Sequence, residues 1–175
     1  MKCSSIAIVA MWVLVGTPAF AQVLKGKNEA NAGISLSTAK NNGTGADRIN
    51  VVDWRTDYQR FVTDRLAVGP ELFITNRTGN DRDVLIGGVI AYHFGNLDGR
   101  VIPFVELNSG VGFGSDSSAK SDVRVIAGIK LPLGRSGARF KVGPYFYRAS
   151  YDLDKAGYDS FKSFGISWNI GLLWP

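Results

Sequence analysis

Cysteine is almost absent from the sequence, because Cys3 is the only one in 175 residues. A chain with one cysteine forms no internal disulfide, so burial and backbone hydrogen bonding must hold its fold together. Histidine is equally scarce, and His93 alone offers an imidazole for acid–base chemistry. Outside residues 1–21, no stretch approaches the ~20 apolar residues of a membrane-spanning helix. Lysine and arginine are spread along the chain without a cluster, which argues against a nucleic-acid partner.

The N-terminal segment has the features of a secretory signal peptide. Lys2 precedes an apolar run at residues 6–15, and the sequence Ala-Phe-Ala follows at residues 19–21. A positive start, a short apolar run and an A-x-A site are typical of leaders that are removed after export. We therefore predict that residues 1–21 are a signal peptide and that residues 22–175 form one exported domain.

Large apolar residues alternate with small or polar ones through most of the predicted domain. Near the C-terminus, for example, Ile166, Trp168 and Ile170 are separated by Ser167 and Asn169. A period of two predicts β-strands with one apolar face, and no segment shows a helical period over three turns. Eight such segments are predicted, at 29–38, 49–61, 66–75, 83–94, 100–112, 121–132, 138–149 and 161–174.

The connections between these segments predict an up-and-down arrangement of strands. Three short turns are centred on Asp64, Asn96 and Arg135, and they alternate with longer polar connections at 39–48, 76–82, 114–120 and 150–160. Short turns at one end and longer loops at the other are typical of outer-membrane barrels, whose termini both lie in the periplasm. An even number of strands also closes a barrel without a free backbone edge in the hydrocarbon. The sequence therefore predicts an all-β, eight-stranded, antiparallel, up-and-down transmembrane β-barrel.

Proline recurs in three predicted strands, each of which follows a short turn. Pro70, Pro103 and Pro144 each lie a few residues after a short turn, two positions beyond a valine. Proline lacks the N–H group that a central strand donates, and it is usually confined to edges and bulges. We therefore expect local β-bulges at these three sites.

Period-two alternation alone does not say which face of the sheet is inside. A soluble barrel of the lipocalin type has its apolar face inside. Charges of both signs on the polar face instead favour ion pairs that fill a small barrel surrounded by lipid. The charged residues predicted to lie inside are Asp53, Arg55, Asp57, Glu71, Glu106, Arg124, Lys130, Arg139 and Lys141. The aromatic residues predicted to form girdles at the membrane interfaces are Tyr58, Tyr92, Phe94, Phe146, Phe164 and Trp174.

Three segments resemble a known family. Residues 58–69, YQRFVTDRLAVG, are similar to the hairpin of small bacterial outer-membrane barrels of the OmpX, OmpA N-terminal-domain and opacity-protein kind. Residues 123–133 and 165–174 are similar to the sixth and last strands of that family. The resemblance implies a barrel in the Gram-negative outer membrane. It also implies that the assembly machinery reads the last strand, although the family usually ends on an aromatic residue and here Pro175 follows Trp174.

Candidates for chemistry are few. Some barrels of this size modify lipid A with a histidine, a serine and a carboxylate, but no serine lies near His93 along its strand. The aspartates at 152, 154 and 159 lack the spacing of a calcium loop. The glycine tract at 110–114 is not followed by the helix that a phosphate-binding loop requires. We predict no catalytic, cofactor-binding or metal-binding residue.

The functional prediction is a structural and surface-interaction protein without an open channel. We expect a monomer that contacts lipid and lipopolysaccharide and presents its loops to host or surface ligands. Two alternatives stay open: an outer-membrane enzyme that modifies lipid A and is centred on His93, and a soluble lipocalin-like barrel that binds a ligand.

Overall fold

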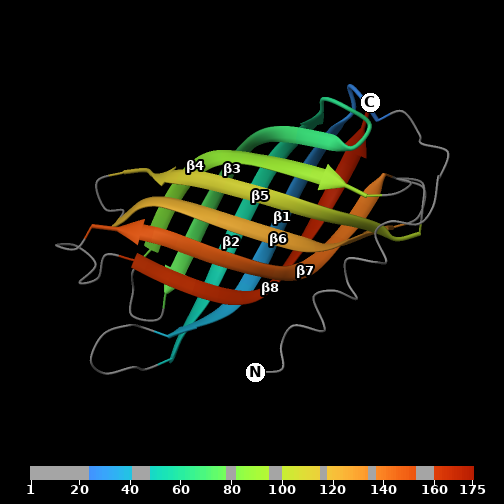
Figure 1. The fold of residues 1–175 in the computed structure, drawn as a ribbon. Helices are drawn as coiled ribbons and strands as arrows, with labels where there is room; N and C mark the ends of the chain where they lie inside the picture. The colour runs from blue at the N-terminus through green and yellow to red at the C-terminus, as the bar shows by residue number, and fades with distance from the viewer. Residues whose placement is uncertain are drawn as a thin grey trace.

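The computed structural model describes residues 24–40, 48–77, 82–94, 100–114, 118–133, 137–152 and 160–175. These residues form eight β-strands (Figure 1). The strands are β1 (Asn28–Lys40), β2 (Arg48–Phe61), β3 (Leu66–Arg77), β4 (Arg82–His93), β5 (Ile102–Gly112), β6 (Ala119–Pro132), β7 (Ala138–Tyr151) and β8 (Ser160–Trp174). All eight predicted segments are confirmed, with boundaries shifted by no more than two residues. In this part of the chain, no helix has the length and apolar character needed to cross a membrane.

The strands close into one barrel. Each strand pairs antiparallel with its neighbours in sequence, and β8 returns to pair with β1. This last pairing runs from Asn28 opposite Trp174 to Ala39 opposite Ser163. Figure 1 shows the strands slanting around the closed wall. Closure gives every strand a hydrogen-bonding partner on both sides, as a sheet in hydrocarbon requires. The prediction of an eight-stranded antiparallel up-and-down barrel is confirmed.

The alternation along the strands separates an apolar outer surface from a polar interior. In β8, Ile166 and Ile170 are 49% and 62% exposed, whereas Ser167 and Asn169 between them are buried. All nine charged residues predicted to lie inside are buried, and none is more than 7% exposed. A soluble lipocalin-like barrel has the opposite distribution, so that alternative is wrong.

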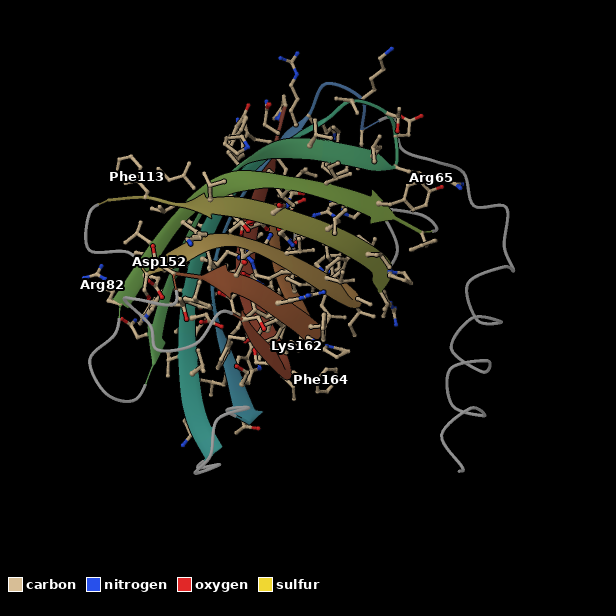
Figure 2. All side chains as sticks on the ribbon, turned by 60° about the vertical axis from the view of Figure 1, so that its left-hand side comes forward. Arg65, Arg82, Phe113, Asp152, Lys162 and Phe164 are labelled. Atoms are coloured by element: carbon tan, nitrogen blue, oxygen red, sulfur yellow. The ribbon has the colours of Figure 1, made fainter. Side chains whose placement is uncertain are left out.

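The two ends of the barrel can be distinguished by the residues that lie at each. Arg65 lies at one end, and Arg82, Phe113 and Asp152 lie at the other (Figure 2). We call the first the terminal end, because both described chain termini are there: the Leu24 amide bonds to Asp64 in the same turn as Arg65, and the Pro175 carbonyl accepts from Asn28 of β1. The second is called the loop end.

The predicted aromatic girdle residues lie at two levels along the barrel. At the terminal end, the Tyr58 and Trp174 ring centroids are 6.1 Å apart, and those of Tyr92 and Phe94 are 4.9 Å apart. Phe146 and Phe164 face each other across β7 and β8 in the half of these strands nearer the loop end. Aromatic residues at two levels are typical of barrels that cross two membrane interfaces.

The predicted bulges at the three prolines are wrong. A bulge adds a residue to one strand and shifts its register, but the register stays constant through each proline. Among the described strand pairs, the register shift lies instead between Ala119 and Ser121, where β6 pairs with β7. The prolines keep regular partners on one side, with Pro70 opposite Gly88, Pro103 opposite Ile129 and Pro144 opposite Ile166.

On its other side each proline falls outside the ladder. The β2–β3 pairing omits Pro70 and resumes in the same register, and the β6–β7 pairing omits Pro144 in the same way. The β4–β5 ladder begins one residue after Pro103. Pro70 and Pro144 therefore face a gap in the pairing on this side, whereas Pro103 lies at the end of its ladder, where its carbonyl accepts from the Phe94 amide at 2.8 Å. No extra residue is needed at any of the three sites.

The connection lengths also differ from the predicted alternation. The connection from β3 to β4 takes only residues 78–81, whereas that from β4 to β5 takes residues 94–101. The first was predicted to be long and the second short. The turn around Asp64 is as short as predicted, with the Val62 amide donating to the Leu66 carbonyl at 2.9 Å. The conformation of most other connections lies outside the described residues.

Candidate functional site

The barrel interior is the candidate site, because it gathers charges from strands far apart in sequence. Lys130 of β6 places Nζ 2.8 Å from both carboxylate oxygens of Glu29 on β1. Both side chains are fully buried. Since β7 and β8 separate β6 from β1 in the sheet, this ion pair crosses the lumen.

Arg55 of β2 is the centre of a larger group of charges. Its Nη2 lies 2.8 Å from Asp57 Oδ2 and also contacts Glu106 on β5, and its Nε lies 3.0 Å from Glu71 Oε1 on β3. Lys141 of β7 contacts the other Glu106 oxygen at 2.8 Å. A guanidinium has five N–H donors in a planar fork, which suits it to bridging several carboxylates. The group therefore joins opposite walls of the barrel.

Arg124 of β6 extends this network toward the loop end. Its Nη1 is 2.7 Å from Glu71 Oε1, so Arg55 and Arg124 share one carboxylate oxygen. Its Nε is 2.6 Å from Asp122 Oδ2, and its Cζ lies 3.6 Å from the centroid of the Phe73 ring. This stacked position adds a cation–π contact to the two ion pairs.

A further contact crosses the lumen beyond Arg124. The Tyr145 hydroxyl on β7 donates to Asp53 Oδ2 on β2 at 2.7 Å. Asp53 is fully buried and forms no ion pair with the described residues. The hydrogen bond from Tyr145 therefore stabilises this carboxylate in the interior.

Apolar clusters close both ends of the charged interior. At the terminal end, the backbone amide of Leu24 donates to Asp64 at 3.0 Å, and its buried side chain belongs to one cluster. The other residues of this terminal plug are Phe61, Ala67, Ala91 and Ile102. A loop-end plug includes Phe73, Leu85, Tyr147, Tyr151 and Phe161. The charged network thus packs against apolar clusters toward both ends of the lumen.

His93 lies inside the barrel at the last position of β4. It is fully buried, and its Nδ1 donates to the Arg65 carbonyl oxygen at 3.1 Å. Its ring packs 5.1 Å from Phe61 and 6.4 Å from Phe104. Among the described residues, no serine or carboxylate forms a hydrogen bond with His93, and its Nε2 has no partner. The histidine therefore lies inside the barrel and packs against Phe61 of the terminal plug.

The acidic tract at 152–159 and the glycine tract at 110–114 are sequence features for which no binding role is predicted. Asp152 lies 3.7 Å from Lys120 in an exposed ion pair, while residues 154 and 159 lie outside the described residues. Residues 110–112 are part of β5, so this glycine tract is strand. In the described ranges, no group of three or more histidine, cysteine, aspartate or glutamate side chains could hold a metal ion.

Sequence analysis missed two features of the site. Leu24 stands before the first strand, where no periodic pattern marks it as buried. The outer surface also carries an apolar groove of about 880 Å³. Ile34 of β1 is one of its lining residues and lies opposite Trp54 of β2 on one side and Trp168 of β8 on the other. The two tryptophans are visible in the sequence, but only the register of the three strands shows that they lie on either side of Ile34.

A closed eight-stranded barrel with an apolar outside and a charged, filled inside defines the class of small transmembrane β-barrels. No protein-family model matches the sequence, and no curated protein matches it either. The fold is nevertheless that of solved outer-membrane proteins. Neisserial surface protein A (NspA) has a TM-score of 0.55 and 13% identity, with 86% of this chain and 98% of that chain covered.

Two further solved structures have the same fold. The outer-membrane enzyme PagL has a TM-score of 0.52 and 17% identity, with 80% of this chain and 97% of that chain covered. The N-terminal β-barrel domain of Pseudomonas aeruginosa OprF has a TM-score of 0.50 and 15% identity, with 87% of this chain and 100% of that chain covered. One of these proteins is an enzyme, so the fold alone does not define an activity.

Proposed function

We propose that this chain is a bacterial outer-membrane protein whose closed barrel is a structural scaffold and conducts no ions. The observation that carries this proposal is the set of buried ion pairs that cross the lumen between two apolar plugs. The apolar outer surface and the likeness of the fold to solved outer-membrane barrels support the location. The function then belongs to the surfaces at the loop end, where host or other surface ligands would bind.

A filled interior supports the absence of a channel. Eight strands enclose a lumen that side chains alone can fill. An ion would have to displace both plugs and separate pairs such as Lys130–Glu29 and Lys141–Glu106, whose atoms are 2.8 Å apart. Parting buried charges in a medium of low dielectric constant is expensive.

Conductance in planar bilayers tests this proposal. The purified barrel is expected to insert without stable single-channel currents, and its band should shift between unheated and boiled samples in a detergent gel. A variant that truncates one residue of each plug and removes one ion pair, Leu24→Ala and Phe161→Ala with Glu29→Ala and Lys130→Ala, provides a positive control for leakage. Steady open-channel currents from the wild-type protein would contradict a closed scaffold.

We also propose that His93 has a packing role and that the chain is not a lipid A-modifying enzyme. The imidazole is enclosed by Phe61, Phe104 and the terminal plug, out of reach of a lipid on the outer surface. Cells that express the wild-type protein and the His93→Asn variant are therefore expected to give identical lipid A mass spectra. A change in acylation that depends on His93 would establish the enzyme instead.

The remaining proposals concern export and assembly. We propose that cleavage follows Ala21, that the termini lie in the periplasm, that the assembly machinery reads β8, and that the barrel is a monomer in contact with lipid and lipopolysaccharide. The complete pairing of β8 with β1 up to Trp174 supports a role for the last strand in closure. N-terminal sequencing of the membrane form should begin at Gln22. Light scattering in detergent should give the mass of one chain.

A further inference from the structure

Two cations face each other on the outer surface near the loop end. Arg148 of β7 is directly opposite Lys162 of β8. Both side chains are exposed, and the residues before and after each of them are buried. The alternation of the strands therefore points Arg148 and Lys162 away from the lumen and onto the surface that surrounds the barrel.

This arrangement is unfavourable for the protein by itself. Opposed side chains on one face of an antiparallel pair have Cβ atoms about 4.5–5.5 Å apart, and like charges at that distance repel. Within the described ranges, neither Arg148 nor Lys162 forms an ion pair with an acidic side chain. The neighbour of Arg148 on its other side is Val123, which offers no charge. An anion held between the two side chains would convert the repulsion into attraction.

Along the outer faces of β7 and β8, the residue type changes step by step from the middle of the barrel to the loop end. Toward the middle of the barrel, the next outward pair is Phe146 with Phe164, and the one after it is Pro144 with Ile166. Toward the loop end, the next pair is Ser150 with Ser160. Figure 2 shows Lys162 and Phe164 near each other on β8. The order from hydrocarbon to aromatic to cationic to hydroxyl matches the order of chemistry along a lipid, from acyl chain to headgroup.

We propose that Arg148 and Lys162 bind the phosphate group of an anionic membrane lipid, whose acyl chain lies along Phe146, Phe164 and Ile166. This inference rests on the proposed function in one respect, namely that the outer surface is in a membrane. A guanidinium binds phosphate through two parallel N–H groups, and a lysine ammonium adds a point charge. Phe164 is 65% exposed and Ile166 is 49% exposed, so an apolar surface continues directly from the cations. That continuity favours a phosphate that carries a hydrocarbon chain.

Other exposed cations of the chain differ and serve as controls. Lys120 has an acidic partner in Asp152, at 3.7 Å. Arg60 also points outward and is exposed, but it lies near the terminal end of β2, where its β1 partner is Asn28. Replacing Arg60 therefore removes one outward charge without touching the opposed pair.

The test compares full-length mature protein folded into two kinds of vesicle. One kind is phosphatidylcholine alone, and the other is phosphatidylcholine with a minor fraction of phosphatidic acid. Phosphatidic acid is expected to raise the midpoint of thermal unfolding of the wild-type and Arg60→Gln proteins. The double variant Arg148→Gln with Lys162→Gln should lose most of that rise. Its affinity for phosphatidic acid, measured by native mass spectrometry, should fall by about tenfold or more, because two cationic contacts are lost.

Three further readings make the test decisive. In phosphatidylcholine alone, the double variant should be at least as stable as the wild type, because a like-charge pair has been removed. Inorganic phosphate added to those vesicles should give no rise, since it carries no acyl chain. A full rise in the double variant, or an equal rise with inorganic phosphate, would overturn the inference. Failure of the wild-type protein to insert into either vesicle would instead overturn the proposed membrane location.

Discussion

Lys130 and Glu29 form a bidentate ion pair across the lumen, with Nζ 2.8 Å from each carboxylate oxygen. The two residues are 101 positions apart in sequence and lie on strands that do not pair with each other. Neither is exposed to solvent. The pair therefore links one wall of the barrel to the opposite wall. Because both groups are buried, each charge is stabilised mainly by the opposite charge of its partner.

Breaking this pair from one side should cost more than replacing it. Lys130→Met leaves the Glu29 carboxylate buried without its cation and is expected to lower the free energy of unfolding by about 3–5 kcal/mol. Glu29→Met should have a similar effect. The double variant should lose less than either single variant, because two apolar side chains of similar volume replace the pair. Urea unfolding in detergent or vesicles, followed by tryptophan fluorescence, measures the three values. Additive losses would refute the coupling.

Arg124 should not be replaceable by lysine. A lysine ammonium cannot at once contact Asp122, reach Glu71 and stack flat on Phe73, as the guanidinium does. Arg124→Lys is expected to lower the free energy of unfolding by about 1–3 kcal/mol in the same urea experiment. Arg60→Lys, at an exposed position, should change it by less than about 0.5 kcal/mol. Equal effects of the two changes would mean that only the charge matters.

Two adjacent glycines of β4 should differ sharply in their tolerance of a methyl group. A Cβ on Gly87 would overlap the carbonyl oxygen of Ser109 and lie 2.5 Å from the Cα of Gly110. A Cβ on Gly88 would meet nothing nearer than the Gly69 carbonyl oxygen, at 3.5 Å. Gly87→Ala is therefore expected to cost about 1–3 kcal/mol through displaced backbone, and Gly88→Ala to be nearly neutral or stabilising. The yield of folded protein in a gel-shift refolding assay should follow the same order.

The sequence predicts the strands and their faces well, for a physical reason. A strand has a strict period of two, so a run such as residues 163–170 fixes both the conformation and the set of residues on each face. The mixed charges of Arg55, Asp57 and Lys130 then identify the inner face, because only a lipid-facing barrel hides such residues. No knowledge of strand pairing is needed for either step.

The partners inside the lumen could not be predicted in the same way. Arg55 contacts Glu106 and Glu71 because the tilt and stagger of the strands bring these residues to one height, and alternation carries no information on height. The prediction of β-bulges at the prolines failed for a related reason. The sequence shows that Pro70 and Pro144 lack an N–H group, but only the pairing shows that this side of each strand faces a gap.

Quenching of Trp54 by brominated lipid tests the central claim most directly. Trp54 is 51% exposed on the outer face of β2, well away from both ends of the strand. A protein of residues 22–175 with Trp168→Phe and Trp174→Phe retains Trp54 as its only tryptophan. In vesicles of phosphatidylcholine brominated near the centre of the acyl chain, its fluorescence should be strongly quenched, and acrylamide in the water should have little effect. Strong quenching by acrylamide with none by the brominated chains would contradict a barrel whose apolar face lies in hydrocarbon.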